Sequence, residues 1–482
     1  MGEAVYKDSY TPQEYKEFSV RLEKQLAQLH ELIHQPAFSQ GAPSLGAELE
    51  LYLVDDDYMP ACVNEDLLRL ANNPQLTPEL NRYNLEFNLS PVPAAGLSLT
   101  AIEKELRDFL DTLQAHARSI DAHIIPIGIL PTLQERHLSQ EYMTDRPRYH
   151  ALSNGLCKMR GDDFHIDING IDHLSLHGEG VTVEGANTSF QVHLRVKADE
   201  FARCHNAAQL TTPFTLAMGA NSPLIAGMRL WQESRIALFQ QSIDFRERGS
   251  PDWRQPARVT YGHGWVREGA WELFAENVAV YPPIIPALSD QAEGSLALPE
   301  LCIHHGTVWP WNRAVYGGDH LRIEFRTLPA GPTVIDMLAN AALSIGWAAG
   351  LGDSVDQYIA RLPFRFAEYN FYRAAQYGME AKILWPRKHV GGVEERWIVD
   401  LIEEFLPRAR TGLELLGIDE ADIARVWKVI EQRLETRRTG ASWQLQEYDR
   451  YRDKCTMEEA CGRMLADYVD RVMEGNPVAT WC

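Results

Sequence analysis

Four segments of the chain alternate apolar and polar residues with the two-residue period of a β-strand. They are GAELELYLV at 46–54, RYNLEFNLS at 82–90, SFQVHLRV at 189–196 and LRIEFRTL at 321–328. In each segment the apolar residues share one face and most polar residues share the other. The pattern predicts an antiparallel sheet whose apolar face packs under helices.

Helical periodicity marks much of the remaining chain. Helices are predicted over 11–34, 101–122, 198–218 and 224–246. Thr100 and Glu103 have the spacing of a capping box at the start of the second of these helices. A short apolar strand is expected at 123–130, further strands over 258–328, and mainly helices after Pro332. Strands and helices in this order predict an α+β fold.

Residues 160–185 are predicted to form strands joined by turns, one of them at Asn169-Gly170. This segment also contains His165, His173 and His177 beside several acidic residues. A metal cluster is conceivable there. The spacing matches no ligand pattern of a metal site, so a solvated hairpin is favoured.

The polar faces of the four strands carry a distinctive set of side chains. If the strands share one sheet, that face gathers Glu48, Glu50, Glu86, Gln191, His193, Glu324 and Arg326. Carboxylates this close repel one another unless a cation joins them. Glutamate oxygens with one imidazole suit Mg²⁺ or Mn²⁺, and the lack of a cysteine disfavours zinc. The alternative is a solvated face with incidental acids, but the set contains no lysine, which favours the metal site.

Charge and composition narrow the choice of partners. The 482 residues carry a formal net charge of −21, which repels phosphate backbones and makes nucleic acid an unexpected partner. Seven scattered cysteines without a CxxC pair are typical of free thiols in a reducing cytosol. The apolar stretch at 334–352 is interrupted by Asp336, Asn340 and Ser344, which favours a buried helix over a membrane span. With no apolar signal segment near Met1, we expect a cytoplasmic protein without a membrane partner.

A group of glutamates that binds several Mg²⁺ ions is typical of enzymes that transfer a phosphoryl group from a nucleotide. The ions bridge the phosphates and neutralise charge as the γ-phosphoryl group moves. The chain has neither a GxxxxGK[ST] loop nor the HRD and DFG motifs, so it is not a P-loop protein or a protein kinase. Metal ions and arginines would have to hold the nucleotide.

Six motifs in order, from about residue 44 to about residue 385, carry a resemblance to a known family. They are GAELELYLV, ELNRYNLEFNLSP, NTSFQVHLRV, ANSPLIAGMRLWQESRIALF, GTVWPWNRAVYGGDHLRIEFRTLPAGPT and YNFYRAAQYGMEA. Together they resemble the glutamate–cysteine ligase family of plants and many bacteria, which includes the related carboxylate–amine ligases. That family has a glutamine synthetase and guanido kinase-like fold, with a polar metal-binding sheet face.

The resemblance implies an ATP- and Mg²⁺-dependent ligase of small molecules. ATP would phosphorylate a carboxylate, expected to be the γ-carboxylate of L-glutamate, and an amine, expected to be L-cysteine, would attack the acyl phosphate. This is the first step expected of glutathione biosynthesis. The motif GTVWPWNR is closer to the carboxylate–amine ligase branch, so a different amine acceptor remains the alternative.

The resemblance also implies roles for individual residues. The metal ligands would be Glu48, Glu50, Glu79, Glu86, His193 and Glu324. Glu324 and Arg326 would be catalytic, and Arg326 would stabilise the charge on the phosphoryl group during its transfer. Substrate would be bound by Arg235, Arg313, Gln191 and Asn221, and the nucleotide by Arg322, Arg373 and Tyr377. A helix-surface ion pair for Arg235, a loop contact for Arg313, and helix packing for Arg373 and Tyr377 are the alternatives.

We expect three parts in the chain: an N-terminal helix in 1–40, a catalytic domain in 41–390 and a helical C-terminal extension in 391–482 packed on it. The extension could form a lid or a dimer interface, and a homo-oligomer is compatible with the sequence. Arg433 in this extension is expected on a solvated helix face.

Two further hypotheses stay open. A phosphagen-type kinase shares this fold class and would retain the phosphate on its product, whereas a ligase releases free phosphate. A non-catalytic binding protein on a ligase scaffold would lack metal ligands, and all six are present in the sequence.

Overall fold

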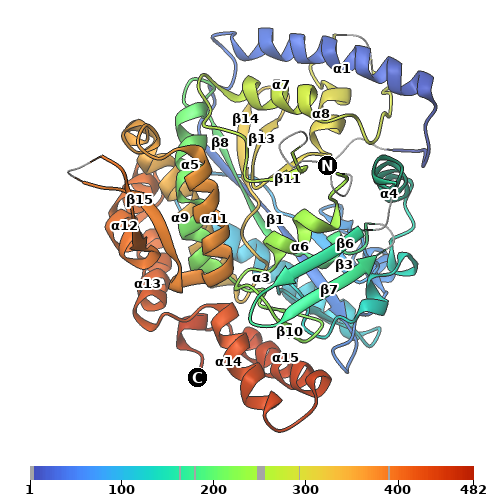
Figure 1. Ribbon diagram of the computed structural model, residues 1–482, viewed down its shortest axis with the longest axis vertical. Coiled ribbons are helices and arrows are strands. Elements are labelled where there is room, and N and C mark those ends of the chain that lie inside the picture. The colour runs from blue at the N-terminus through green and yellow to red at the C-terminus, as the bar shows by residue number, and fades with distance from the viewer. Residues whose placement is uncertain (1–4, 162–163, 179–180, 247–255, 292–293, 389–390) are drawn as a thin grey trace.

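A computed structural model describes residues 5–482, except 162–163, 179–180, 247–255, 292–293 and 389–390. Its centre is an eight-stranded antiparallel sheet (Figure 1). The strand order is β13 (Asn312–Tyr316), β14 (Leu321–Phe325), β8 (Phe190–Val196), β1 (Ser44–Val54), β3 (Asn84–Asn88) and β2 (Leu76–Pro78), with β4 (Val92–Pro93) and β5 (His123–Ile125) paired to the ends of β1. The four alternating segments are therefore neighbouring strands of one sheet, which confirms the α+β prediction.

The register of the strands aligns the polar residues. Glu50 of β1 lies opposite Glu86, and His193 lies opposite Glu324. Side chains alternate faces, so a slip of one residue would turn each of these groups into the apolar core. The observed register instead places them all on one face.

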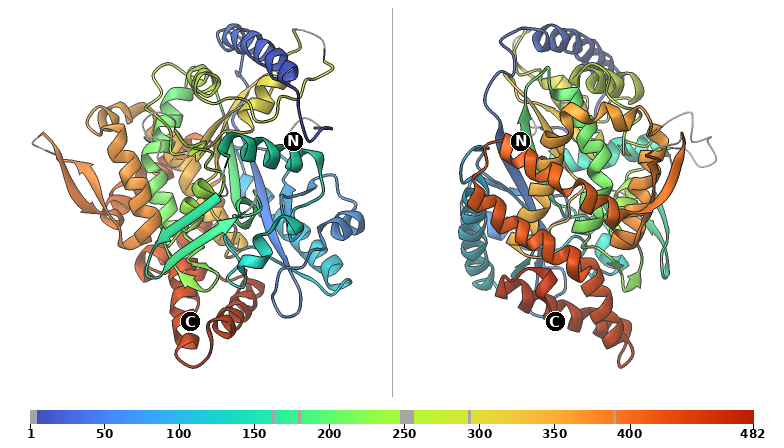
Figure 2. Two further views of the ribbon diagram at one scale, coloured as in Figure 1. Left: turned by 45° about the vertical axis from the view of Figure 1, so that its right-hand side comes forward. Right: turned by 90° about the vertical axis from the view of Figure 1, so that its left-hand side faces the viewer.

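Helices cover the apolar face of the sheet (Figures 1 and 2). They include α3 (Ser98–Arg118), α5 (Phe201–Gly219) and α9 (Val334–Leu351), and α12 (Ile398–Leu415) and α13 (Glu420–Thr436) pack in turn on α9. At the crossing of α9 and α12, a Cβ on Gly412 would lie 1.8 Å from the carbonyl oxygen of Gly346, so this approach requires glycine. The segment Val334–Ser354 is apolar enough to cross a membrane, but 89% of its most apolar 18-residue stretch is buried, as predicted for a core helix.

A second hydrophobic cluster covers part of the opposite face, beyond the glutamates. It joins Tyr52 of β1 to the hairpin β6 (Phe164–Asn169) and β7 (His173–Gly178) and to helices α14 (Gly440–Arg452) and α15 (Met457–Glu474). The C-terminal helices α14 and α15 thus share a hydrophobic cluster with Tyr52 and the hairpin, and they lie at one end of the molecule (Figure 2).

The other elements surround this centre. The remaining helices are α1 (Pro12–Ile33), α2 (Asn64–Ala71), α4 (Pro147–Arg160), α6 (Arg235–Ser242), α7 (Ala270–Val280), α8 (Pro299–His305), α10 (Asp356–Ile359) and α11 (Phe364–Tyr377). The short strands β9 (Leu224–Ile225), β10 (Met228–Arg229), β11 (Val259–Thr260), β12 (Trp309–Pro310), β15 (Lys382–Pro386) and β16 (Val393–Trp397) form two-stranded pairs.

The predicted hairpin within 160–185 is confirmed by β6 and β7, although 162–163 and 179–180 lie outside the described residues. His165 lies opposite His177, and His173 contacts Asp167 at 3.2 Å. Among the described residues, the groups of three ligand-type side chains close enough to share a metal ion lie on the sheet and not on this hairpin.

Several local predictions are wrong. The segment 224–246 is not one helix, because a turn at Gly227, with φ +76°, folds β9 onto β10. The apolar strand at 123–130 stops at Ile125, since Pro126 has no amide hydrogen to donate. The stretch 258–328 also contains the helices α7 and α8.

Two predictions for charged and capping residues are also wrong. Thr100 does not cap α3, which begins at Ser98; its backbone N–H donates to Asp422 of α13 at 3.0 Å. Arg433 is not solvated but only 1% exposed, because it forms a 2.7 Å ion pair with Asp336 of α9.

Candidate active site

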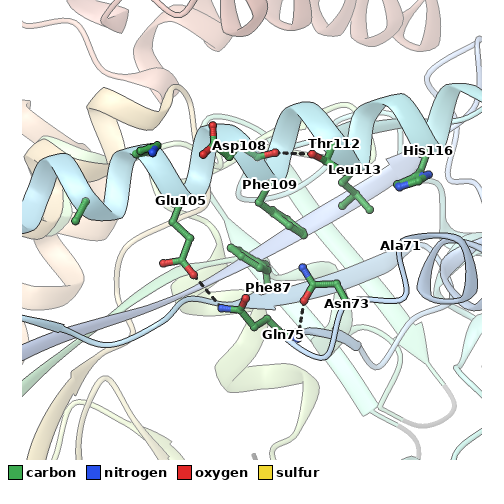
Figure 3. A pocket seen from close by; sticks show the side chains of 12 residues that line it. Ala71, Asn73, Gln75, Phe87, Glu105, Asp108, Phe109, Thr112, Leu113 and His116 are labelled. Atoms are coloured by element: carbon green, nitrogen blue, oxygen red, sulfur yellow. Dashed lines mark hydrogen bonds between the residues drawn. The ribbon is translucent and has the colours of Figure 1, made fainter.

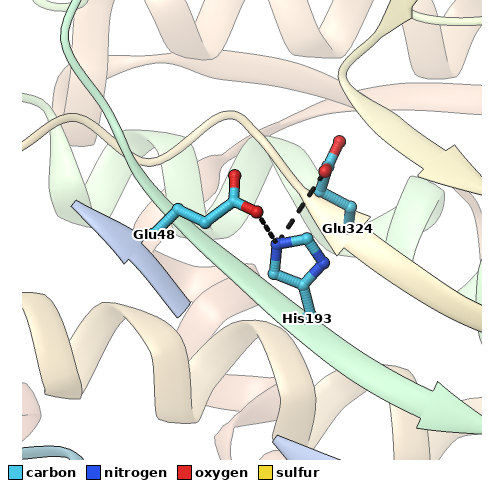
Figure 4. A group of neighbouring side chains, drawn as sticks. All are labelled: Glu48, His193 and Glu324. Carbon is cyan, nitrogen blue, oxygen red and sulfur yellow. Dashed lines mark ion pairs between the residues drawn. The ribbon is translucent and has the colours of Figure 1, made fainter. Parts of the chain in front are cut away.

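Three neighbouring strands supply the first group of ligand-type side chains (Figure 4). Nε2 of His193 on β8 lies 3.2 Å from Oε1 of Glu48 on β1 and 3.8 Å from Oε1 of Glu324 on β14. The side chain of Glu324 is only 2% exposed and that of His193 7%. We call these three residues the histidine cluster.

Arginines surround Glu324 on its other side. Arg313 of β13 contacts its Oε2 at 2.6 Å, and Nη1 of Arg326 donates to the same oxygen at 3.0 Å. Burial alone would keep this carboxyl protonated, but Arg313 and Arg326 outweigh it and hold the pKa of Glu324 well below its usual range. Glu324 is therefore a carboxylate throughout the physiological pH range.

The two ring nitrogens of His193 have different partners. Nε of Arg322 donates to Nδ1 at 3.1 Å, whereas the buried Nε2 lies between the carboxylates of Glu48 and Glu324 without a well-aligned hydrogen bond to either. Nε2 can offer a lone pair to a cation when Nδ1 carries the proton, which requires Arg322 to release Nδ1. The hydrogen-bond geometry thus links Arg322 to the use of His193 as a ligand.

A second group lies beside the first on the same face. Carboxylate oxygens of Glu50, Glu79 and Glu86 lie within 4.8 Å of one another. Glu50 accepts hydrogen bonds from the Ser189 amide at 2.7 Å and from Nε2 of Gln191 at 2.8 Å. We call these three glutamates the glutamate cluster.

The glutamate cluster carries more negative charge than its protein neighbours balance. Burial, with the Glu48 and Glu50 carboxylates, raises the pKa of Glu86 to about 7. Burial, with Glu86 and Glu50, raises that of Glu79 well above its usual value. Carboxyl groups in this state are protonated unless a cation stabilises their charge.

Both clusters fit divalent cations. Oxygen donors with a single buried imidazole, and no cysteine, are the ligand set preferred by Mg²⁺ or Mn²⁺. The Nε2 of His193, which has no well-aligned hydrogen bond, and the crowded glutamates are the groups such ions would satisfy. The structure brings together all six residues for which a metal-ligand role is predicted.

The excess negative charge of the glutamate cluster should make the free energy of unfolding depend on pH. A carboxyl whose pKa is higher in the folded than in the unfolded protein binds more protons when folded, so the free energy of unfolding falls as pH rises from about 4.5 to the folded pKa. For Glu86 that limit is about 7, and for Glu184, discussed below, it is about 8. We expect Mg²⁺ to raise the Tm by a few degrees at pH 8 and by less at pH 6.

Differential scanning fluorimetry with MgCl₂ or EDTA checks this expectation. A Glu86→Gln variant, which removes one of the charges, should show a smaller Mg²⁺ shift. An equal Mg²⁺ effect at both pH values in the wild type would contradict it.

Gln191 and Arg326 connect the two clusters. Nη1 of Arg326 donates to Oε1 of Gln191 at 2.6 Å, and Gln191 donates in turn to Glu50. Arg326 thereby contacts Glu324 of the histidine cluster directly and is linked to Glu50 of the glutamate cluster through Gln191. Gln191, for which substrate binding is predicted, occupies a position between the two groups of carboxylates.

Asn221 and Arg235 belong to neither cluster, although the charge of Arg235, like that of Arg326, opposes the burial that raises the pKa of Glu50. Asn221 is fully buried and bonded to the backbone and to α15. Arg235 is 3% exposed and paired with Glu233 at 3.1 Å. The Arg373 guanidinium lies over the ring of Tyr377 on the same helix, α11, 4.0 Å from the ring centroid. Nucleotide binding by that pair remains a prediction.

Two further residues near the clusters have no role predicted from the sequence. Glu184, in the 3₁₀ turn Glu184–Ala186, has a pKa raised to about 8 by burial and by Glu50. Arg195 lies directly opposite Arg322 on the neighbouring strand, and like charges so placed repel unless an anion joins them. The alternation of SFQVHLRV could have identified Arg195, but nothing in a turn marks Glu184.

A groove of about 500 Å³ lies elsewhere, between α3 and β3 (Figure 3). Phe87 and Phe109 stack at its base, and Glu105 accepts a hydrogen bond from Gln75 at 2.9 Å. Phe87 points to the apolar face of β3, so this groove is on the opposite side of the sheet from the glutamates. It contains none of the residues of either cluster.

Comparison with known proteins gives three results. Residues 44–467 match the model of glutamate-cysteine ligase family 2. The crystal structure of a glutamate–cysteine ligase from Francisella tularensis in complex with AMP is 13% identical, with 90% of each chain covered and a TM-score of 0.58. A bifunctional glutathione synthetase from Pasteurella multocida is 12% identical, with 95% of this chain and 55% of that chain covered and a TM-score of 0.49. No curated protein sequence matches significantly.

The family match covers most of the chain, including both clusters and the helices α12 to α14. The Francisella structure shows that the fold is that of a solved glutamate–cysteine ligase. The chain is therefore an enzyme of glutamate–cysteine ligase family 2, as the resemblance of its motifs implies.

Proposed function

We propose that the protein is an ATP- and Mg²⁺-dependent ligase that joins the γ-carboxylate of L-glutamate to the amino group of L-cysteine. The observation that carries this proposal is the pair of carboxylate clusters on one sheet face, joined by Arg326. The family supports the reaction class, and the clusters supply carboxylates for divalent ions that would in turn neutralise the phosphates of ATP.

The positions of the arginines suggest how the substrates would lie. Divalent ions held by the two clusters would neutralise the phosphates and polarise the phosphoryl group. Arg326, between the clusters, would stabilise the charge that develops during transfer. Arg322 and Arg195 lie on the same sheet face as the histidine cluster, two residues further along their strands. They would face the remaining phosphates of the nucleotide.

The proposed reaction has two steps. A γ-carboxylate oxygen of glutamate bonds to the γ-phosphorus of ATP, the bond to the bridging oxygen breaks, and ADP leaves. The amine nitrogen then attacks the carbonyl carbon of the acyl phosphate, inorganic phosphate leaves, and the nitrogen loses a proton. Each turnover therefore releases one ADP and one phosphate for each amide bond formed.

Phosphate release with ATP, Mg²⁺, L-glutamate and a panel of amines tests the proposal. We expect L-cysteine to stimulate release most strongly, with γ-glutamylcysteine detected by mass spectrometry in equal amount. EDTA should abolish the reaction, and excess Mg²⁺ should restore it.

The other outcomes separate the remaining hypotheses. Stimulation by another amine would keep the acyl-phosphate chemistry and assign a different carboxylate–amine ligase. ADP release with phosphate retained on a guanidine product would instead indicate a phosphagen-type kinase. No ADP release with any acceptor would overturn the ligase proposal.

A further inference from the structure

The C-terminal helices hold a loop that leads to the active site. This loop, 218–222, comprises the last two residues of α5 and the three that follow, and four C-terminal residues contact it. Arg433 donates to the carbonyl of Met218 at 3.0 Å, and the Ala441 amide donates to that of Ala220 at 2.9 Å. Gln444 and Tyr468 bind the side chain of Asn221, at 2.8 Å and 2.9 Å.

A chain of buried polar contacts runs from this loop to Arg326. The Asn221 amide donates to Glu233 at 2.9 Å, and Glu233 pairs with Arg235 at 3.1 Å. Arg235 then donates to the backbone carbonyls of Thr327 at 3.2 Å and Arg326 at 3.4 Å. We call Asn221, Glu233 and Arg235 the buried relay, and none of its members is more than 3% exposed.

The segment 327–330, directly after β14, is held from two sides. On one side it bonds to the start of β8 and to the chain just before it: the Phe190 amide donates to the carbonyl of Leu328, and the Ala330 amide donates to that of Thr188. On the other side the relay bonds to it, because Nδ2 of Asn221 donates to the Ala330 carbonyl at 2.8 Å. The backbone between these contacts sets the positions of Arg326 and of the Ser189 amide that binds Glu50.

We propose that α14 and α15 position Arg326 through the buried relay, so that Gln444 and Tyr468 are positioning residues of the active site. The inference rests on the proposed function for its catalytic consequence but not for the contacts themselves. It gives Asn221 and Arg235 a role in holding the site's backbone.

The chemistry of the contacts supports positioning over simple packing. Tyr468 is fully buried. Its hydroxyl accepts a hydrogen bond from Nδ2 of Asn221 and donates one to the carbonyl of Pro126 at 3.0 Å. A hydroxyl bonded on both sides fixes one arrangement of its partners, whereas an apolar contact of the same area would allow several. Small displacements of catalytic groups have large effects on rate.

The test compares Tyr468→Phe with Tyr451→Phe. Each variant loses one hydroxyl from the same pair of helices, but the Tyr451 hydroxyl bonds to Asp467, outside the relay. For Tyr468→Phe we expect kcat to fall about tenfold with the KM values for ATP and glutamate nearly unchanged. Tyr451→Phe should keep the wild-type kcat. Gln444→Ala, which releases Asn221 from α14, should act in the same direction as Tyr468→Phe.

Hydrogen exchange supplies a readout that does not depend on activity. In Tyr468→Phe, peptides that contain Phe190 and Ala330 should exchange faster, while peptides from the centre of β1 should not change. If exchange there is unchanged, the relay does not hold the segment and the proposal is overturned. Faster exchange with a wild-type kcat would overturn the catalytic role. If the wild type itself has no ligase activity, the proposed function fails while the exchange result still decides the relay.

Discussion

Replacing Glu324 by glutamine is expected to reduce phosphate release by about a thousandfold. The wild-type carboxylate lies against His193 and accepts from both Arg313 and Arg326. Glutamine has nearly the same shape but no charge, so it binds a divalent ion poorly and leaves two guanidinium groups without their shared counter-charge. Phosphate release at saturating ATP and Mg²⁺ measures the loss.

The matched control is Glu105→Gln on α3, a glutamate that binds Gln75 in the groove on the other side of the sheet (Figure 3). It should retain wild-type activity. Circular dichroism should show the same secondary structure in both variants. A folded Glu324→Gln enzyme with full activity would exclude Glu324 as a metal ligand.

Replacing Arg326 by lysine is expected to lower kcat by about a hundredfold and to change the KM for ATP only a few-fold. The Arg326 guanidinium contacts Gln191 and Glu324 together. Lysine keeps the charge but places it at a single point, so it cannot maintain both contacts and also face a phosphoryl group. Steady-state kinetics with ATP varied provides the measurement.

Arg322→Lys is the matched comparison, because it lies on the same face of β14 four residues earlier. Arg322 contacts the His193 ring instead of the link between the clusters, so its replacement should raise the KM for ATP more than it lowers kcat. If both variants changed KM alone, Arg326 would act in nucleotide binding and not in the transfer step.

The sheet and its polar face could be predicted because alternation is a local property. In GAELELYLV and LRIEFRTL, each Leu or Ile marks the buried face and so assigns Glu48, Glu50 and Glu324 to the other. The strands themselves proved to be neighbours, with Glu50 opposite Glu86 and Glu324 opposite His193. Glu79 followed from the family motif and not from alternation, since it precedes the strand.

The remaining features depend on contacts between distant segments. Thr100 has the spacing of a cap, yet Asp422, 322 residues away, supplies its partner. Arg433 has the sequence context of a solvated arginine, yet Asp336 and the carbonyl of Met218 bury it. Asn221 and Arg235 belong to family motifs, but their hydrogen-bond partners come from α15, Glu233 and the backbone after β14. No local pattern contains such information.

The order of the strands has a consequence for the synthesis of the protein. Central strand β1 pairs with β8, about 140 residues later, and β8 pairs with β14, about 130 residues later still. Tyr468 adds a contact with Asn221 that is separated by 247 residues. A ribosome-bound chain therefore contains every glutamate of both clusters well before α15, which supplies the contact with Asn221, has been synthesised.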